Sequence, residues 1–141
     1  MNGQPWHFVI VRDDKTKAAL AAIKNRFCPP EKQAYQADFL LKAPVIMVVC
    51  VEKKRSFGRE IENGILAASL IMLGAHSRGL GTVYMSAYIS EEPKLSEAIR
   101  NELGLPEGLA PVSILPLGYP DEIPQPKELR PLKEIIHFDH F

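Results

Sequence analysis

The sequence predicts an α+β fold with helices around a mainly antiparallel mixed sheet. Short apolar runs bounded by turn residues indicate strands, and longer periodic runs between them indicate helices. The two kinds of run do not alternate strictly, which argues against a parallel βαβ sheet. A chain of 141 residues can bury a real core. We therefore expect residues 1–141 to form one domain.

The N-terminal half predicts two strands and two helices. The expected order is a strand at 7–11, a helix at 15–25, a weaker helix at 31–41 and a strand at 43–51. Asp13 and Asp14 can cap the first helix, and Pro29 and Pro30 break the chain after it. The second strand is apolar at successive positions, so we expect both of its faces to be covered.

Residues 59–78 predict a long central helix. Its apolar side chains surround most of the helix and are Ile61, Ile65, Leu66, Leu70, Ile71, Met72, Leu73 and Ala75. A helix of this kind must be buried on nearly every side. One sheet cannot cover it completely, so a second subunit is a natural candidate for the rest. Gly79 followed by Leu80 fits a left-handed C-cap.

The C-terminal half predicts shorter elements and an extended tail. Residues 82–87 read as a strand or extended loop, Ser90 as the cap of a helix ended by Gly104 and Pro106, and 111–117 as a strand. The segment 119–141 is proline-rich and then apolar again. Because proline favours extended chain, we expect this tail to reach away and dock on its own domain or on a partner.

Composition excludes several functional classes. Lys+Arg and Asp+Glu both number 17, so the basic excess of a nucleic-acid binder is missing. No apolar run approaches a membrane span, and the start is not a signal peptide, so we expect a cytoplasmic protein. The two cysteines, Cys28 and Cys50, do not suggest a disulfide framework. Cys50 lies in an apolar run and reads as a buried thiol.

No motif indicates catalysis by side chains alone. The sequence has no nucleophile elbow, no GxGxxG and no P-loop. The four histidines are too scattered for metal ligands; only His137 and His140 have suitable spacing, and they lie at the terminus. This absence suits chemistry supplied by a cofactor that the protein binds and orients.

Four segments together resemble the nitroreductase family of FMN-dependent oxidoreductases. They are NGQPWHFVIV, ENGILAASLIMLGAHSRGLGTVYMSA, IRNELGLPEGLAPVSILPLGYP and PKELRPLKEIIHF, in the order that the family has. The resemblance implies an intertwined homodimer with FMN at the subunit interface. It also implies two-step hydride transfer from NADH or NADPH through the flavin to a small electron-poor acceptor, such as a nitroaromatic compound or a quinone.

The resemblance assigns cofactor-binding residues at three places. Asn2 matches an asparagine that faces the flavin, with Gln4 beside it; alternatively, Asn2 is only a turn residue. The backbone of Tyr84, Met85, Ser86 and Ala87 would lie against the isoalloxazine ring, where the small Ser86 and Ala87 allow an N–H to approach N5 or O4. Alternatively, these residues only end a core strand.

Lys127 and Arg130 match basic residues that the family places near the FMN phosphate. An arginine fork forms strong charge-assisted bonds with phosphate. The alternative is a pair of solvated charges on a proline-rich tail. The resemblance assigns no catalytic side chain, because the chemistry takes place at flavin N5.

The sequence departs from the family at its start. Members usually open with a helix carrying an arginine-serine-x-arginine pattern that grips the phosphate, and this sequence begins after it. We therefore expect weaker FMN binding and uncovered apolar surface. Three hypotheses follow: an FMN-dependent oxidoreductase, a flavin-free dimeric remnant with a binding or structural role, and a flavoenzyme for another task such as dehalogenation or flavin breakdown.

Overall fold

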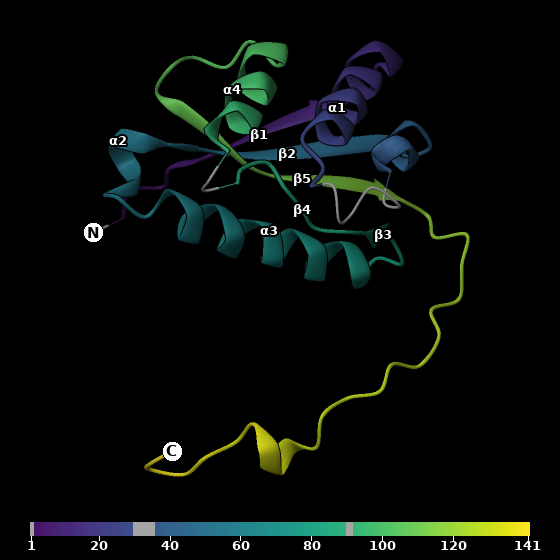
Figure 1. Cartoon of the computed structure of the whole chain (residues 1–141), viewed down its shortest axis with the longest axis vertical. Coiled ribbons are helices and arrows are strands. Elements are labelled where there is room, and N and C mark those ends of the chain that lie inside the picture. Colours follow the sequence, from purple (N-terminus) through teal and green to yellow (C-terminus); the bar gives the residue numbers. More distant parts are fainter. Residues whose placement is uncertain (1, 30–35, 90–91) are drawn as a thin grey trace.

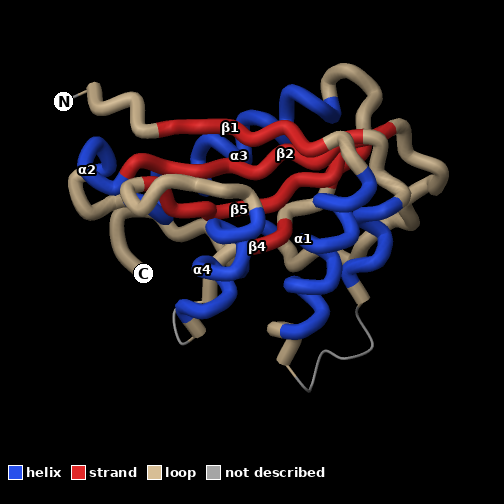
Figure 2. Tube along the Cα trace, turned by 90° about the horizontal axis from the view of Figure 1, so that it is seen from above, coloured by secondary structure: helices blue, strands red, loops and turns tan. Residues whose placement is uncertain are grey.

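The computed structural model describes residues 2–29, 36–89 and 92–141. Its sheet has the strand order β1-β2-β5-β3, and β4 also pairs with β5. The strands are β1 (Trp6–Val11), β2 (Val45–Glu52), β3 (Gly81–Thr82), β4 (Met85–Ser86) and β5 (Leu109–Gly118). All four described pairings are antiparallel, which confirms the sheet predicted from the sequence. Figure 2 shows β1, β2 and β5 side by side, with β1 at one edge.

Helices cover both faces of this sheet. The helices α1 (Asp14–Arg26) and α4 (Pro93–Glu102) lie on one face, and α3 (Glu60–His76) lies on the other (Figure 1). The larger core cluster forms under α1 and α4 and includes Leu20, Ile46, Leu95 and Ile114. Ile46 and Val48 of β2 belong to this cluster, whereas Val49 belongs to the cluster beneath α3, so both faces of β2 are covered, as its apolar run predicts.

The helix ends follow the local capping signals. The Asp13 carboxylate accepts a hydrogen bond from Thr16 N at 2.8 Å and caps α1. α3 ends in a Schellman motif, in which Gly79 N donates to His76 O and Leu80 N donates to Ala75 O. Gly79 has φ +73°, a conformation that glycine adopts at little cost. The C-cap predicted at Gly79 is therefore confirmed.

Two elements differ from the prediction, and some predicted positions lie outside the described residues. Residues 37–41 form a 3-10 helix (Ala37–Leu41), labelled η2, where the sequence predicts the end of an α-helix. Its first N–H, on Ala37, donates to the Asn25 side chain at 2.7 Å, so a tertiary contact sets where it begins. Positions 31–35 of that predicted helix and the predicted cap Ser90 are not described. The short helix α2 (Lys53–Ser56) has no counterpart in the prediction.

The long helix α3 is covered on one side only. Gly64, Ala68 and Ala75 are buried against the sheet side. Leu66, Leu70 and Leu73 are 64%, 71% and 67% exposed. Burial on nearly every side, predicted from the sequence, is therefore not reached within one chain. The uncovered leucines form a stripe with helical spacing, which we call the α3 leucine stripe.

The C-terminal tail extends away from the sheet. Residues 119–141 are exposed throughout and contain one short 3-10 helix, η3 (Leu132–Glu134). In Figure 1 the tail leaves the end of β5 and runs to the side of the molecule on which α3 lies. Among the described residues, no helix has the length and apolar character needed to cross a membrane.

Candidate functional site

The register of β4 with β5 decides which backbone groups lie on the outer edge of β4. Met85 pairs with Ile114 and Ser86 with Ser113, and Ala87 N donates to Val112 O at 2.9 Å. In an antiparallel pair, residues alternate between those that bond to the neighbouring strand and those that point their backbone groups away. The bond from Ala87 therefore turns the N–H and the C=O of Ser86 away from β5, toward the free edge of β4.

A lysine from α1 reaches this free edge. Lys24 Nζ donates to the backbone oxygen of Ser86 at 2.7 Å, although the two residues are 62 positions apart. This bond agrees with the outward orientation of the Ser86 carbonyl. It also joins the C-terminal end of α1 to β4, so that the two elements form the walls of one cavity.

The side chains of the 84–87 segment point in alternate directions. Met85 and Ala87 are buried in the core under α1 and α4, and Tyr84 packs with the cluster beneath α3. The hydroxyl of Ser86 donates to Tyr88 O and accepts from Tyr88 N. Ala87 is completely buried, so a larger side chain here would have to displace its neighbours. The side chains of Met85 and Ala87 thus anchor the segment in the core, while the outer backbone edge of β4 stays accessible.

The cavity beside β4 has a volume of about 420 Å³. Its lining combines apolar, aromatic and polar side chains: Lys24, Asn25, Phe27, Cys28, Pro29, Ala37, Tyr84, Met85, Ser86 and Ile89. Burial lowers the pKa of Lys24, with a smaller opposing effect from Cys28. Burial also raises the pKa of the Tyr84 phenol. Three of the site residues predicted from the sequence, Tyr84, Met85 and Ser86, line this cavity.

The N-terminal segment packs against α2 and the end of β2. Glu52 N donates to Pro5 O at 2.8 Å, and Arg55 Nη1 donates to Gly3 O at 3.4 Å. Gln4 has φ +44°, and Asn2 and Gln4 are both exposed. The segment therefore runs along α2 with both predicted site residues open to solvent.

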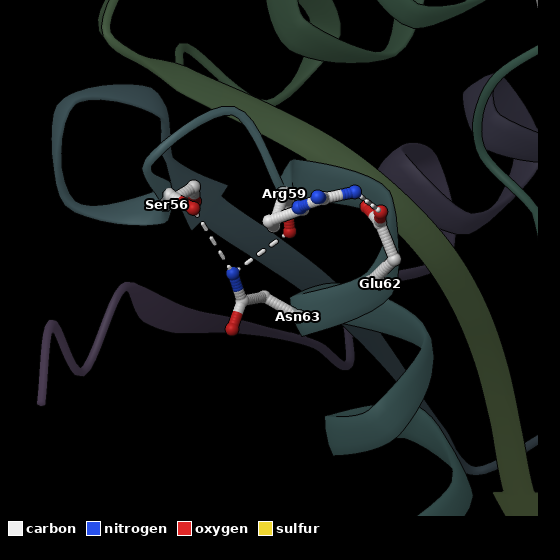
Figure 3. A network of polar contacts seen from close by, with 4 residues as sticks. All are labelled: Ser56, Arg59, Glu62 and Asn63. Carbon is white, nitrogen blue, oxygen red and sulfur yellow. Dashed lines mark hydrogen bonds and ion pairs between the residues drawn. The ribbon is translucent and has the colours of Figure 1, made fainter. Parts of the chain in front are cut away.

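A polar network holds the start of α3 in place (Figure 3). Asn63 Nδ2 donates to the backbone oxygens of Ser56 at 3.4 Å and of Arg59 at 2.7 Å. Arg59 forms an exposed ion pair with Glu62 at 3.1 Å. The backbone oxygen of Asn63 accepts from Trp6 Nε1 at 3.0 Å. The network thus ties β1, and with it the N-terminal segment, to α3.

The structure brings the predicted site residues together only in part. Tyr84, Met85, Ser86 and Ala87 form one continuous edge, and Asn2 and Gln4 lie by α2 and α3. Lys127 and Arg130 are exposed on the tail, and Figure 1 shows this segment extending away from the sheet. Within the described parts of the chain, no group of three or more His, Cys, Asp or Glu side chains could hold a metal ion.

Sequence reasoning missed Lys24. In the sequence it is one of several lysines on a helix, and such residues usually lie in solvent. Only its contact with Ser86, across 62 positions, places it at the cavity. No sequence pattern around Lys24 marks it as a residue of the cavity.

Known proteins resemble this chain in sequence. The sequence profile of the nitroreductase family matches residues 1–119. A protein from Methanothermobacter thermautotrophicus, named as an NADH dehydrogenase/NAD(P)H nitroreductase, is 34% identical over 128 residues, 89% of this chain and 61% of that protein. An iodotyrosine deiodinase from Thermotoga neapolitana is 31% identical over 152 residues, 96% of this chain and 75% of that protein.

Solved structures share the fold. A protein from Parabacteroides distasonis, also named as an NADH dehydrogenase/NAD(P)H nitroreductase, superposes with a TM-score of 0.81 at 28% identity and covers 99% of this chain and 76% of its own. An FMN-dependent nitroreductase from Clostridium difficile gives a TM-score of 0.80 at 26% identity, over 98% of this chain and 77% of its own. The chain spans 61% and 64% of two similar curated proteins. The match over residues 1–119 and the shared fold show that this chain belongs to the nitroreductase family.

Proposed function

We propose that this chain is an FMN-dependent NAD(P)H oxidoreductase, or the larger part of one, and that it acts as a homodimer on a small electron-poor acceptor. The observation that carries the proposal is the outward N–H of Ser86 at the free edge of β4. This donor lies in the 84–87 segment, which the family resemblance assigns to the flavin ring. The names of the relatives, NAD(P)H nitroreductase and FMN-dependent nitroreductase, support the same reaction class.

The 84–87 segment fits the isoalloxazine ring of a flavin. Ser86 offers a backbone donor on an accessible edge, and the N–H of Ala87 is already bonded to Val112 O. Of the two donors considered from the sequence, Ser86 is therefore the one we assign to flavin N5 or O4. Bound FMN would supply hydride transfer between NAD(P)H and the acceptor, while the protein supplies position and hydrogen bonds.

We expect binding of the FMN phosphate to depend on the C-terminal tail and on the association of two copies of the chain. Lys127 and Arg130, the proposed phosphate ligands, lie on an exposed tail that also carries Ile135, Ile136 and Phe138. The α3 leucine stripe is exposed in the same chain, and exposed apolar patches of this kind indicate association. A second copy would cover the stripe and receive the tail, which would bring the two cations to a flavin at the interface.

An FMN titration of the purified chain tests the proposal. We expect saturable quenching of flavin fluorescence, a rise in the thermal midpoint, and bleaching of the bound flavin by NADH or NADPH. Ser86→Pro removes the outward N–H without removing a bond to β5, and Ser86→Ala keeps that N–H. FMN affinity should fall at least about tenfold in the proline variant and stay within about threefold in the alanine variant. A dimer that ignores millimolar FMN would instead support the flavin-free alternative.

Reductive dehalogenation is a second candidate. The similarity to a deiodinase in sequence, and to an iodotyrosine deiodinase structure with FMN and 3-iodo-L-tyrosine at a TM-score of 0.76 and 28% identity, favours it. The reaction would consume two electrons and a proton and release iodide. Iodide release from 3-iodotyrosine, compared with nitro-group reduction under the same conditions, would separate the two candidates.

A further inference from the structure

Lys24 is a half-buried cation at the cavity wall. Its ammonium group has three N–H donors, and one is used by Ser86 O at 2.7 Å. Among residues 2–29, 36–89 and 92–141, no carboxylate forms an ion pair with Lys24 Nζ. A cation that is partly removed from water without a counter-charge is costly. The remaining donors of Lys24 are therefore available to a negative group in the cavity.

The polar side chain that follows Lys24 in α1, Asn25, already has hydrogen-bond partners. Asn25 Nδ2 donates to Asp38 Oδ1 at 2.8 Å, and Asn25 Oδ1 accepts from Ala37 N at 2.7 Å. Both ends of this amide are thus used to join α1 to η2. Asp38 is exposed and bonded to Asn25, and no ion pair joins it to Lys24 in the described structure. The neighbouring polar groups build the wall, and within the described residues the charge on Lys24 is met by no carboxylate and only by the smaller influence of Cys28.

The rest of the lining suits an aromatic ring. Phe27, Met85 and Ile89 line the cavity and contribute apolar surface, including one aromatic ring. A volume of about 420 Å³ lies at the lower end of the range for small-molecule sites, which are mostly apolar with a few polar groups that fix orientation. One charged group in an otherwise apolar cavity selects the orientation of a one-ring ligand.

We propose that this cavity binds a small aromatic anion, with its carboxylate or another negative group on Lys24 Nζ and its ring between Phe27, Met85 and Ile89. A cationic ligand would face the ammonium group, and a neutral ligand would leave it unpaired. Because Lys24 also bonds to Ser86 O, the ligand lies beside the edge proposed for the flavin. Its role as the electron acceptor rests on the proposed function, whereas its binding does not.

Binding to the unmodified 141-residue chain tests the proposal. We would titrate the flavin-free protein by calorimetry with 4-nitrobenzoate and with 4-nitrobenzamide, which is almost the same shape without the charge. The benzoate should bind at least about tenfold more tightly, the effect of one charge-assisted hydrogen bond. Comparable affinities, or no binding of either compound up to about 10 mM, would overturn the proposal.

Three variants assign the preference to Lys24. Lys24→Met should reduce the preference for the benzoate to less than about threefold, and Lys24→Arg should retain most of it. Lys15→Met, at an exposed position of the same helix, should leave it unchanged. A role of Lys24 only as a tether for β4 would change the affinities for both compounds equally, and that result would also refute the proposal.

The same series performed with FMN separates this inference from the proposed function. Benzoate binding that depends on Lys24, in a chain that does not bind FMN, would support the anion site and reject the oxidoreductase. FMN binding without a preference for the charged compound would support the oxidoreductase and reject the anion site.

Discussion

Gly64 of α3 lies directly on Val112 of β5. A Cβ atom on Gly64 would stand 2.5 Å from both Val112 Cβ and Val112 Cγ1, closer than real Cβ atoms come. Opposite this part of β5, the register with β2 shifts between Val49 and Cys50. The shift leaves Val112 as the extra residue of β5. The distance between α3 and the sheet is therefore set by the absence of a side chain at position 64.

A side chain at position 64 should overpack the contact between α3 and β5. Gly64→Ala should lower the free energy of unfolding by about 1–2 kcal/mol, although alanine favours helix, because overpacking of a buried contact costs more than helix propensity returns. Urea unfolding would measure this. Gly74→Ala in the same helix, where the nearest atom is the end of the Arg78 side chain at 3.7 Å, should stabilise the protein. Full stability of Gly64→Ala would contradict this close packing of α3 on β5.

Ser113 predicts a stabilising substitution. Its hydroxyl is completely buried and has no hydrogen-bond partner within the described structure. Ser113→Ala removes an unsatisfied polar atom and should raise the free energy of unfolding by about 1 kcal/mol. The control is Ser56→Ala, since the equally buried Ser56 Oγ donates to Glu52 O at 2.8 Å, and that variant should be destabilised. Equal effects of the two substitutions would be inconsistent with this assignment.

The hydrogen bonds of Asn63 should stabilise the start of α3. Asn63→Ala removes the hydrogen bonds to Ser56 O and Arg59 O and should destabilise the protein by about 1–2 kcal/mol. Thermal unfolding would show the change, and Asn101→Ala on the exposed face of α4 serves as the control. A variant as stable as this control would mean that the network in Figure 3 contributes little.

The α3 leucine stripe predicts a dimer that a charge disrupts. Leu70 is 71% exposed in the single chain, so Leu70→Glu should cost a monomer almost nothing. In a homodimer it would place a charge in an apolar interface, and sedimentation at micromolar concentration should change from dimer to monomer. Glu97→Lys, exposed on α4, should not alter the mass. A wild-type monomer would argue against the proposed assembly.

Cys50 predicts an alkaline loss of stability. Burial raises the pKa of its thiol from 9.0 to about 12. Between these values the unfolded chain loses the proton and the folded chain keeps it, so stability falls as pH rises through this window. Cys50→Ala should flatten this dependence in unfolding experiments. In the native protein at pH 8, a thiol reagent should label partly exposed Cys28 quickly and Cys50 only after unfolding.

The sequence predicts most of the local structure because the signals are local. Asp13, Gly79 and Gly104 act on groups within a few residues, and apolar runs define β1, β2 and β5 without further information. The short α2 was not predicted, and residues 37–41 form a 3-10 helix where an α-helix was predicted. In the second case the reason is clear: Asn25 binds Ala37 N from another element, which no local pattern encodes.

In the candidate site, too, the sequence predicts the local features and the tertiary contacts decide the rest. The sequence by itself determined that Ser86 and Ala87 are small, that the 84–87 segment is extended and followed by a helix, and that the tail carries Lys127 and Arg130. Only the tertiary structure decided that Ser86, and not Ala87, turns its N–H outward, because the register with β5 sets that alternation. It also brought Lys24 to the same edge across 62 positions. Propensities and caps act between neighbours in sequence, whereas a binding site is formed by segments that meet only when the chain folds.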